Sequence, residues 1–334
     1  MKTQTTLEAL PPRITSATEY GSDYDVRRWL GELADDERWD ARSVVGRDGG
    51  KVVGCLPIWR STLSRTPQNE ITRELTTLGL PNDVPCLHLG PHSRKIGGAA
   101  VVRRRDRWAS EECLTALIRR ATEEAQAIGL RPVALYVPHS QLAAFLRSWP
   151  TPPRVHPADM FSRLEVEVDS SGRVHHASKR VRDVWTHDAR AAEDLRLERS
   201  WSQVTKELIA EAAPLVAAVS RNNGAIAHHR LSAYQLEKWW TFDSQSARAL
   251  SVRTSGGELA GVTFARLRES ALEVYEVGMP DEFEQRRFLY ATLCFVEPLK
   301  FVAANGLTTI ELGTGHSSAK RSRGAEQELL WHIY

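Results

Sequence analysis

The sequence predicts an α/β protein with mixed sheets, built from two similar domains in tandem. Two pairs of similar segments recur in the same order along the chain. With 334 residues, 42% hydrophobic and 26% charged, the chain has the composition of a soluble globular protein and the length for two cores. Strand-like runs alternate with helical periodicity in its second half, as expected when helices pack on a sheet.

The first repeated segment is a glycine-rich hairpin. Residues 47–59 read RDGGKVVGCLPIW and residues 253–266 read RTSGGELAGVTFAR. Paired glycines supply the positive φ angles of a tight turn. A further glycine, Gly54 or Gly261, then interrupts the second strand, where we expect a β-bulge or a close backbone approach.

The second repeated segment is a helix end followed by a buried strand. Residues 127–135 read AIGLRPVAL and residues 304–312 read ANGLTTIEL, so each has a helix-terminating glycine before an apolar run. The two glycines, Gly129 and Gly306, are 306 − 129 = 177 positions apart. A duplicated domain explains both pairs of segments, and chance similarity of short motifs is the alternative.

The two halves differ in length between these landmarks. The hairpin glycines are 261 − 54 = 207 positions apart, so the first half carries 207 − 177 = 30 additional residues. The proline-rich segment SWPTPPRVHPAD, residues 148–159, is typical of a boundary. We therefore expect an N-terminal domain at residues 1–160 and a C-terminal domain, which carries the candidate site, at residues 161–334.

The second half predicts a defined order of elements. These are a strand at 195–199, helices at 202–222 (with Ser202 as N-cap) and 231–241, strands at 247–254, 258–267 and 271–279, a helix at 284–305 kinked by Pro298, and strands at 307–312 and 328–334. A helix joins the strand at 271–279 to the strand at 307–312, so these strands should be parallel, with a right-handed crossover. Gly278 and Gly313 should then open into one crevice beyond their carboxyl ends.

Composition and motifs exclude several classes of function. No apolar run approaches the ~20 residues that span a bilayer, and the N-terminus lacks the apolar stretch of a signal peptide, so we expect a cytoplasmic protein. The four cysteines form no C-x-x-C pair, and the pair His228 and His229 has no third ligand at suitable spacing, so we expect no metal site.

The loop GTGHSSAKRSRG, residues 313–324, is the most unusual segment. It does not fit a P-loop, because Ser318 and Ala319 stand where the motif needs glycine and lysine. It does not fit a nucleophile elbow either, because GHSSA ends in alanine and no apolar helix is signalled after it. Its three glycines and three cations favour a basic loop at the end of a strand.

These segments together resemble a known family. The GGELAG hairpin, the passage ANGLTTIELG and the closing GHSSAKRSRG are similar to the GNAT fold as used twice in FemABX-type aminoacyl transferases and related peptidoglycan acyltransferases. The resemblance implies a tandem-GNAT enzyme that moves an acyl group onto an amine. In the best-known members this is an aminoacyl group from charged tRNA, and relatives act on cell-wall precursors or in natural-product (antibiotic) assembly.

The resemblance leaves the acyl donor to be decided. Most GNAT enzymes hold the diphosphate of acyl-CoA in a glycine-containing turn at the start of the helix after the fourth strand. Here residues 280–292 contain no glycine, and Asp281, Glu282 and Glu284 would repel phosphate. We therefore predict aminoacyl-tRNA as donor, no cofactor, and a small-molecule or peptide amine as acceptor. The alternatives are an acyl-CoA-dependent N-acyltransferase and a non-catalytic RNA-binding module on this scaffold.

Single-stranded RNA needs cations for its phosphates and no glycine-rich turn. The predicted tRNA-binding residues are Arg286, Arg287, Arg321, Arg323, Gly313 and Gly324. By carry-over from the matching lysine of the family, Lys320 is the predicted oxyanion donor. Glu273 or Glu276 is the predicted base, and regular alternation would allow only one of them to face the cleft. The predicted substrate contacts are His228, His229, Tyr275, Tyr290, Arg94 and Lys95.

Overall fold

The computed structural model describes residues 3–9, 18–20, 36–63, 70–80, 84–91, 99–103, 107–168, 174–225, 227–268 and 270–334. Contacts divide the chain into unit 1, Met1–Phe161 with Glu328–Tyr334, and unit 2, Ser162–Gln327. Residues 328–334 therefore belong to unit 1. The boundary predicted from the sequence, at residue 160, assigns them to the C-terminal domain. Arg94 and Lys95 lie outside the described residues.

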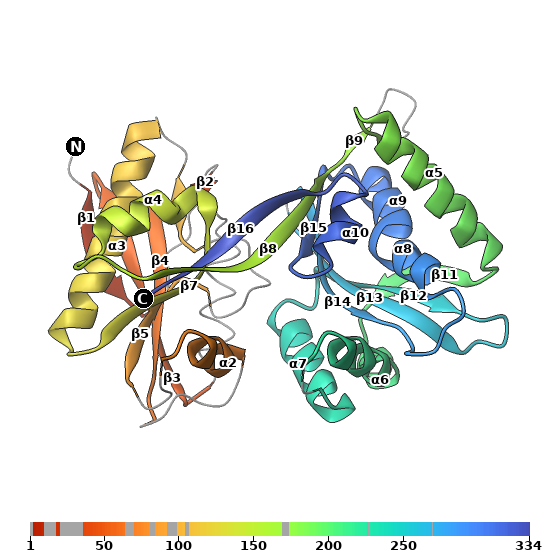
Figure 1. Cartoon of the computed structure of the whole chain (residues 1–334), viewed down its shortest axis with the longest axis horizontal. Coiled ribbons are helices and arrows are strands. Elements are labelled where there is room, and N and C mark those ends of the chain that lie inside the picture. The colour runs from red at the N-terminus through yellow and green to blue at the C-terminus, as the bar shows by residue number, and fades with distance from the viewer. Residues whose placement is uncertain are drawn as a thin grey trace. The chain divides into compact units, whose positions relative to one another are not determined.

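Unit 1 is a mixed sheet with helices on both faces (Figure 1). Its strand order is β1 (Gln4–Glu8), β3 (Trp39–Asp48), β4 (Lys51–Ser61), β5 (Cys86–Leu89), β7 (Arg131–Pro138) and β16 (Glu326–Ile333), with β6 (Val101–Arg103) joining β2 (Thr18–Tyr20) to β4. The helices are α2 (Glu70–Thr77), α3 (Arg107–Ala127) and α4 (His139–Ser148). Strands β5 and β7 are parallel.

Unit 2 repeats this order. Its sheet runs β11 (Glu198–Gln203), β12 (Ala247–Arg253), β13 (Leu259–Leu267), β14 (Ala271–Gly278), β15 (Thr309–Gly313) and β8 (Val155–Glu165), beside a small ribbon of β9 (Glu167–Val168) and β10 (Val174–His175). Its helices are α5 (Lys179–Asp194), α6 (Lys206–Asn222), α7 (His229–Phe242), α8 (Arg286–Ala291), α9 (Glu297–Ala304) and α10 (Ser317–Arg321). The prediction of an α/β fold with two similar halves is confirmed.

The glycine predictions for the two hairpins are also confirmed. Each hairpin carries a register shift at the matching position, between Gly46 and Arg47 in one and between Val252 and Arg253 in the other. A Cβ atom on Gly54 would lie 2.8 Å from Cys113 Sγ of α3. A Cβ on Gly261 would lie 2.9 Å from Leu293 Cδ1. Both glycines therefore let a helix pack directly on a strand.

Several predicted boundaries are wrong. Strand β11 extends to Gln203, so Ser202 lies in a strand, and the side chain of Thr205 caps α6 by accepting a bond from Leu208 N at 3.2 Å. The short helix α10 was not predicted within the basic loop. Gly278 does not face a crevice, because a Cβ there would lie 3.0 Å from Leu215 Cβ of α6.

The predicted irregularity near Pro298 takes the form of a π-helical turn, Thr292–Val296, between α8 and α9. Glu297 N–H donates to Thr292 O, five residues back. The matching donor for Leu293 O would be residue 298, but proline has no N–H. The hydroxyl of Thr263 on β13 donates to Leu293 O instead, at 2.8 Å. A strand side chain thus satisfies the carbonyl that the proline leaves open.

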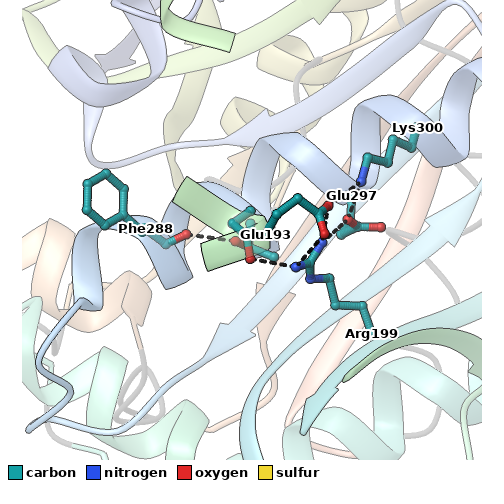
Figure 2. A network of polar contacts seen from close by, with 7 residues as sticks. Glu193, Arg199, Phe288, Glu297 and Lys300 are labelled. Carbon is teal, nitrogen blue, oxygen red and sulfur yellow. Dashed lines mark hydrogen bonds and ion pairs between the residues drawn. The ribbon is translucent and has the colours of Figure 1, made fainter. Parts of the chain in front are cut away.

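A polar network joins three elements of unit 2 (Figure 2). Arg199 of β11 lies 2.8 Å from Glu193 of α5 and 3.4 Å from Glu297 of α9. Lys300 lies 2.9 Å from Glu297 and 3.6 Å from Glu193. Two cations and two carboxylates alternate, so the cluster carries no net charge and links the first strand of the sheet to both helices.

The described residues include no helix that is long and apolar enough to cross a membrane.

Candidate active site

The candidate site lies where β14 and β15 stop pairing. The two strands are parallel, as predicted, over three residue pairs that end at Glu273 and Glu311. Strand β14 continues to Gly278 without this partner, and β15 passes at Gly313 into the basic loop. In a parallel pair the carboxyl ends face the same edge, so this edge is where a ligand is expected.

Lys320 holds the start of the basic loop together. It is 4% exposed, and its ammonium donates to Leu312 O at 2.7 Å, Gly313 O at 3.1 Å and Thr314 O at 2.7 Å. An ammonium has three N–H donors, so these carbonyls take all of them. Lys320 is therefore not placed to donate directly to an oxyanion, which corrects the predicted role. It fixes the loop and leaves a buried positive charge beneath it.

Four residues of this loop have a positive φ: Gly313, Gly315, His316 and Gly324, with φ of 62°, 75°, 47° and 89°. A left-handed backbone is uncommon in a residue other than glycine, and His316 is the non-glycine residue among them. Its ring lies 5.6 Å from that of Tyr290. Burial, together with the charges of Lys320 and Arg286, holds the pKa of His316 below its ordinary value. Sequence reasoning missed His316, since a positive φ outside glycine has no sequence signal.

Tyr290 lies beside the loop on α8, close to Cys294. Burial raises the pKa of Cys294 to about 12, and it raises that of Tyr290 as well. Both groups stay protonated at neutral pH, so neither acts as a base. Tyr290 can offer a hydroxyl or a ring face to a ligand at this edge.

A β-bulge in β14 changes the faces of the two candidate bases. Glu273 pairs with Arg266 and Glu276 pairs with Phe264, while Tyr275 is the extra residue between them. Paired residues point to the same side of a sheet, and residues 264 and 266 share one side. Glu273 and Glu276 therefore lie on the same face, and the expectation that only one could do so is wrong. Bulges often redirect side chains next to active sites.

Glu276 is the more accessible of the two carboxylates. It is half-buried, whereas Glu273 is 3% exposed. Tyr275 stacks on Trp239 of α7, with ring centroids 4.7 Å apart and planes at 3°. The guanidinium of Arg266 lies 4.5 Å from the same Trp239 ring. Tyr275 therefore belongs to a packed stack with the Trp239 ring and the Arg266 guanidinium.

Glu311 is a buried carboxylate that sequence reasoning missed. It lies in register with Glu273 across the parallel pair and with Arg163 on its other side. Arg163 Nη2 lies 3.1 Å from its Oε1, and Arg268 Nη1 lies 2.6 Å from its Oε2. Two arginines therefore hold this carboxylate in place by charge-assisted hydrogen bonds. Its sequence signal was a single glutamate inside the apolar run LTTIEL.

The start of α8 does not fit the diphosphate of CoA. The guanidinium of Arg286 donates to Pro280 O at 2.6 Å and Asp281 O at 3.0 Å. Arg286, a predicted phosphate ligand, therefore binds the backbone of the segment just before its own helix. The carboxylate of Asp281 lies there too, bound by Asn222 Nδ2 at 2.7 Å. The segment offers carbonyls and carboxylates where a diphosphate needs amide N–H groups.

The other predicted cations divide into two groups. Arg287 and Arg321 are exposed, and Arg321 Nε donates to Gln327 at 3.0 Å. Arg323 is buried, and its Nε lies 2.7 Å from Asp188 Oδ2. Arg323 is therefore a structural residue and not an RNA ligand. Gly324 is also structural, because a Cβ there would lie 2.8 Å from His176 Nε2.

His228 and His229 lie at the start of α7, with ring centroids 4.0 Å apart. His228 is the N-cap of the helix and accepts a bond from Arg230 N at 3.3 Å. Both rings are exposed, and the structure does not bring them together with the loop residues by any described contact. The described residues contain no group of three metal-ligating side chains.

Comparison with known proteins establishes the fold. No protein-family model and no curated protein matches the sequence. The solved structure of FemX is 12% identical, with a TM-score of 0.61 over 95% of this chain and 93% of FemX. The C-terminal domain of a putative lysylphosphatidylglycerol synthetase from Agrobacterium fabrum is 9% identical, with a TM-score of 0.55 over 91% of this chain and 86% of that one.

A tandem GNAT protein from the clavulanic acid biosynthesis pathway is 14% identical, with a TM-score of 0.50 over 99% of this chain and 98% of its own. These similarities show that the chain has a tandem-GNAT, FemABX-like fold, as its sequence motifs indicated. At these identities they establish the fold alone.

Proposed function

We propose that the protein is an aminoacyl transferase, which moves an amino acid from charged tRNA onto the amine of a small molecule or peptide. The transfer is assigned to the C-terminal half, at the edge formed by β14, β15 and the basic loop. The observation that carries the choice of donor is the start of α8, where Arg286 and Asp281 take the place of a diphosphate-binding turn. The fold shared with FemX supports the same reaction class.

The reaction forms one amide bond and breaks one ester bond. The neutral amine of the acceptor attacks the ester carbonyl carbon, and the ribose oxygen leaves with the electron pair of the C–O bond. The amine loses a proton and the ribose oxygen gains one, so a base that returns its proton completes the exchange. Glu276 is assigned this role because it is the more accessible of the two carboxylates that share the face.

Lys320 is assigned a positioning role in this reaction. Its three carbonyl contacts fix the geometry of the loop. We assign its charge to the side of the site where negative charge develops on the carbonyl oxygen. Arg287 and Arg321, both exposed, are assigned to the phosphates at the acceptor end of the tRNA.

Replacement of Lys320 tests this assignment. We expect Lys320→Ala to lower the rate of transfer by about 100-fold, the loss expected when the groups that position a substrate shift by about 1 Å. Because Lys320 also holds the loop, Lys320→Arg should retain the charge but not the three-carbonyl geometry, and it should recover little activity. A rate for Lys320→Ala within a few-fold of wild type contradicts the assignment, provided that both variants bind charged tRNA as wild type does.

The decisive assay offers the wild-type protein a set of acceptor amines with either a pool of charged tRNA or acetyl-CoA. Product that forms from charged tRNA and disappears after RNase treatment supports the proposal. Product from acetyl-CoA that is insensitive to RNase identifies an acyl-CoA-dependent N-acyltransferase. Salt-dependent tRNA binding without turnover of any amine identifies an RNA-binding module. Each of the last two outcomes contradicts the proposed function.

A further inference from the structure

The two units carry matched residues at the end of their second parallel strand. Tyr136 in β7 and Gly313 in β15 are 313 − 136 = 177 positions apart, the same offset that relates Gly129 and Gly306. Both have a left-handed backbone, with φ of 56° for Tyr136 and 62° for Gly313. Equal backbone conformations at equivalent positions direct a side chain to equivalent places, so the two sites can be compared directly.

In unit 1 this place is filled. The Tyr136 side chain is 1% exposed and packs in a cluster with Trp59 and Leu75. Its ring centroid lies 5.1 Å from that of His332, whose Nδ1 accepts the Tyr136 N–H at 3.4 Å. His332 Nε2 lies 3.2 Å from a carboxylate oxygen of Glu74. Residues of two strands and a helix therefore hold the tyrosine in place.

In unit 2 the equivalent place is open. A Cβ atom on Gly313 would meet no atom of the described residues within 4 Å, and the same holds for Gly315. This openness is not general to the loop, because a Cβ on Gly324 would lie 2.8 Å from His176 Nε2. The open place adjoins the carbonyls that Lys320 fixes.

We infer that Gly313 is a specificity-determining residue, and that the space it leaves receives the aminoacyl end of the donor. This inference rests on the proposed function. A donor amino acid carries its own side chain, which needs room beside the ester carbonyl. The direction of a Cβ atom on Gly313 is open for at least 4 Å among the described residues, so a side chain of the donor can enter there. The side chain at position 313 then limits the size of the amino acid transferred.

The first test needs no catalytic activity. Gly313→Cys introduces a thiol at the open place, and Gly257→Cys introduces one in the exposed β12–β13 turn, where glycine also has a left-handed backbone and no neighbour within 4 Å in the described chain. All four native cysteines are buried, so their labelling should be slow. We expect both new thiols to react with a small thiol reagent at rates within about tenfold of each other. A Gly313→Cys rate at least 100-fold below that of Gly257→Cys overturns the inference.

Protection separates this inference from the proposed function. The probe is an aminoacyl-tRNA analogue in which an amide replaces the reactive ester. At saturation we expect it to slow labelling of Gly313→Cys at least tenfold and to leave Gly257→Cys unchanged. Binding without protection overturns the inference alone. A failure of the analogue to bind the wild-type protein overturns the proposed function, and this inference falls with it.

A size series gives the functional readout. We expect Gly313→Ala to lower transfer of a large amino acid by about tenfold or more and that of glycine by less, since one methylene in a substrate pocket changes discrimination by about 10- to 200-fold. Gly313→Tyr should abolish both transfers, while Gly257→Tyr changes neither. Equal loss for large and small amino acids in Gly313→Ala overturns the size role. The unfolding midpoint of each variant shows whether it has folded.

Discussion

Units 1 and 2 have the same strand order but support the end of their second parallel strand by different means. Unit 1 uses aromatic packing, with Tyr136 against the ring of His332. Unit 2 uses buried cations, with Lys320 bound to three carbonyls and Arg323 paired with Asp188. Charges fix a loop without filling the space beside it, whereas a large ring fills that space. The difference explains how one copy of a duplicated fold can keep room for a ligand.

Unit 2 should therefore be the more sensitive to the loss of a single buried charge. Asp188→Ala leaves the guanidinium of Arg323 buried without its carboxylate, and we expect a loss of about 3–5 kcal/mol in the free energy of unfolding. Denaturant unfolding measures it. Asp183→Ala on the same helix removes an exposed pair with Lys179 and should cost less than about 1 kcal/mol. Equal effects of the two substitutions would show that the buried pair of Arg323 and Asp188 does not stabilise unit 2 more than an exposed pair does.

Unit 1 should depend on the size of its tyrosine. Tyr136→Ala removes a fully buried ring, and we expect a cost of about 3 kcal/mol from the cavity it leaves. Tyr136→Phe keeps the ring and serves as the matched control. The same unfolding measurement applies. A cost below about 1 kcal/mol for Tyr136→Ala would show that the ring is not what holds this strand end.

The π-helical turn offers a smaller effect that is specific to unit 2. Thr263→Val keeps the shape of the side chain but leaves Leu293 O without its described donor, and we expect a loss of about 1–3 kcal/mol. Pro298→Ala restores an N–H at residue 298. In that background Thr263→Val should cost less, which a double-mutant cycle measures. Additive costs would contradict the role assigned to the hydroxyl.

The network of Figure 2 predicts a pH dependence of small size. The hydrogen bond and charge of Arg199 hold the pKa of Glu193 below its ordinary value of 4.5. A lowered pKa in the folded state means that the contribution is full above that value and is lost as the pH falls through the folded pKa. Because the Glu193 side chain is 67% exposed, Glu193→Gln should cost less than about 1 kcal/mol at neutral pH. The difference between the thermal melts of the two proteins should shrink as the pH falls below 4.5, and a difference that grows toward low pH would contradict this sign.

Short sequence motifs were enough to predict the repeated parts of the fold. The paired glycines marked both hairpins, Gly54 and Gly261 marked the close approach of helices, and a helix between two apolar strands required the parallel crossover. Each of these features depends on residues close together in the chain.

The errors arose where the outcome depends on distant residues. The bulge at Tyr275 depends on how β13 pairs with β14, and it placed Glu273 and Glu276 on one face. The burial of Arg323 depends on Asp188, far away along the chain. The three cations of the basic loop therefore have different roles: Arg323 is structural, Lys320 fixes the loop and Arg321 is exposed. The composition of the loop does not encode this division.

We propose that the edge of unit 2 binds an RNA-borne donor and not CoA. The most direct measurement is equilibrium binding of the purified protein to charged tRNA and, separately, to acetyl-CoA, each at several salt concentrations. We expect saturable binding of charged tRNA that weakens steeply with salt and falls further in the double variant Arg287→Ala, Arg321→Ala. We expect no saturable binding of acetyl-CoA up to millimolar concentration. Tight acetyl-CoA binding that weakens on replacement of residues 280–287 would contradict it.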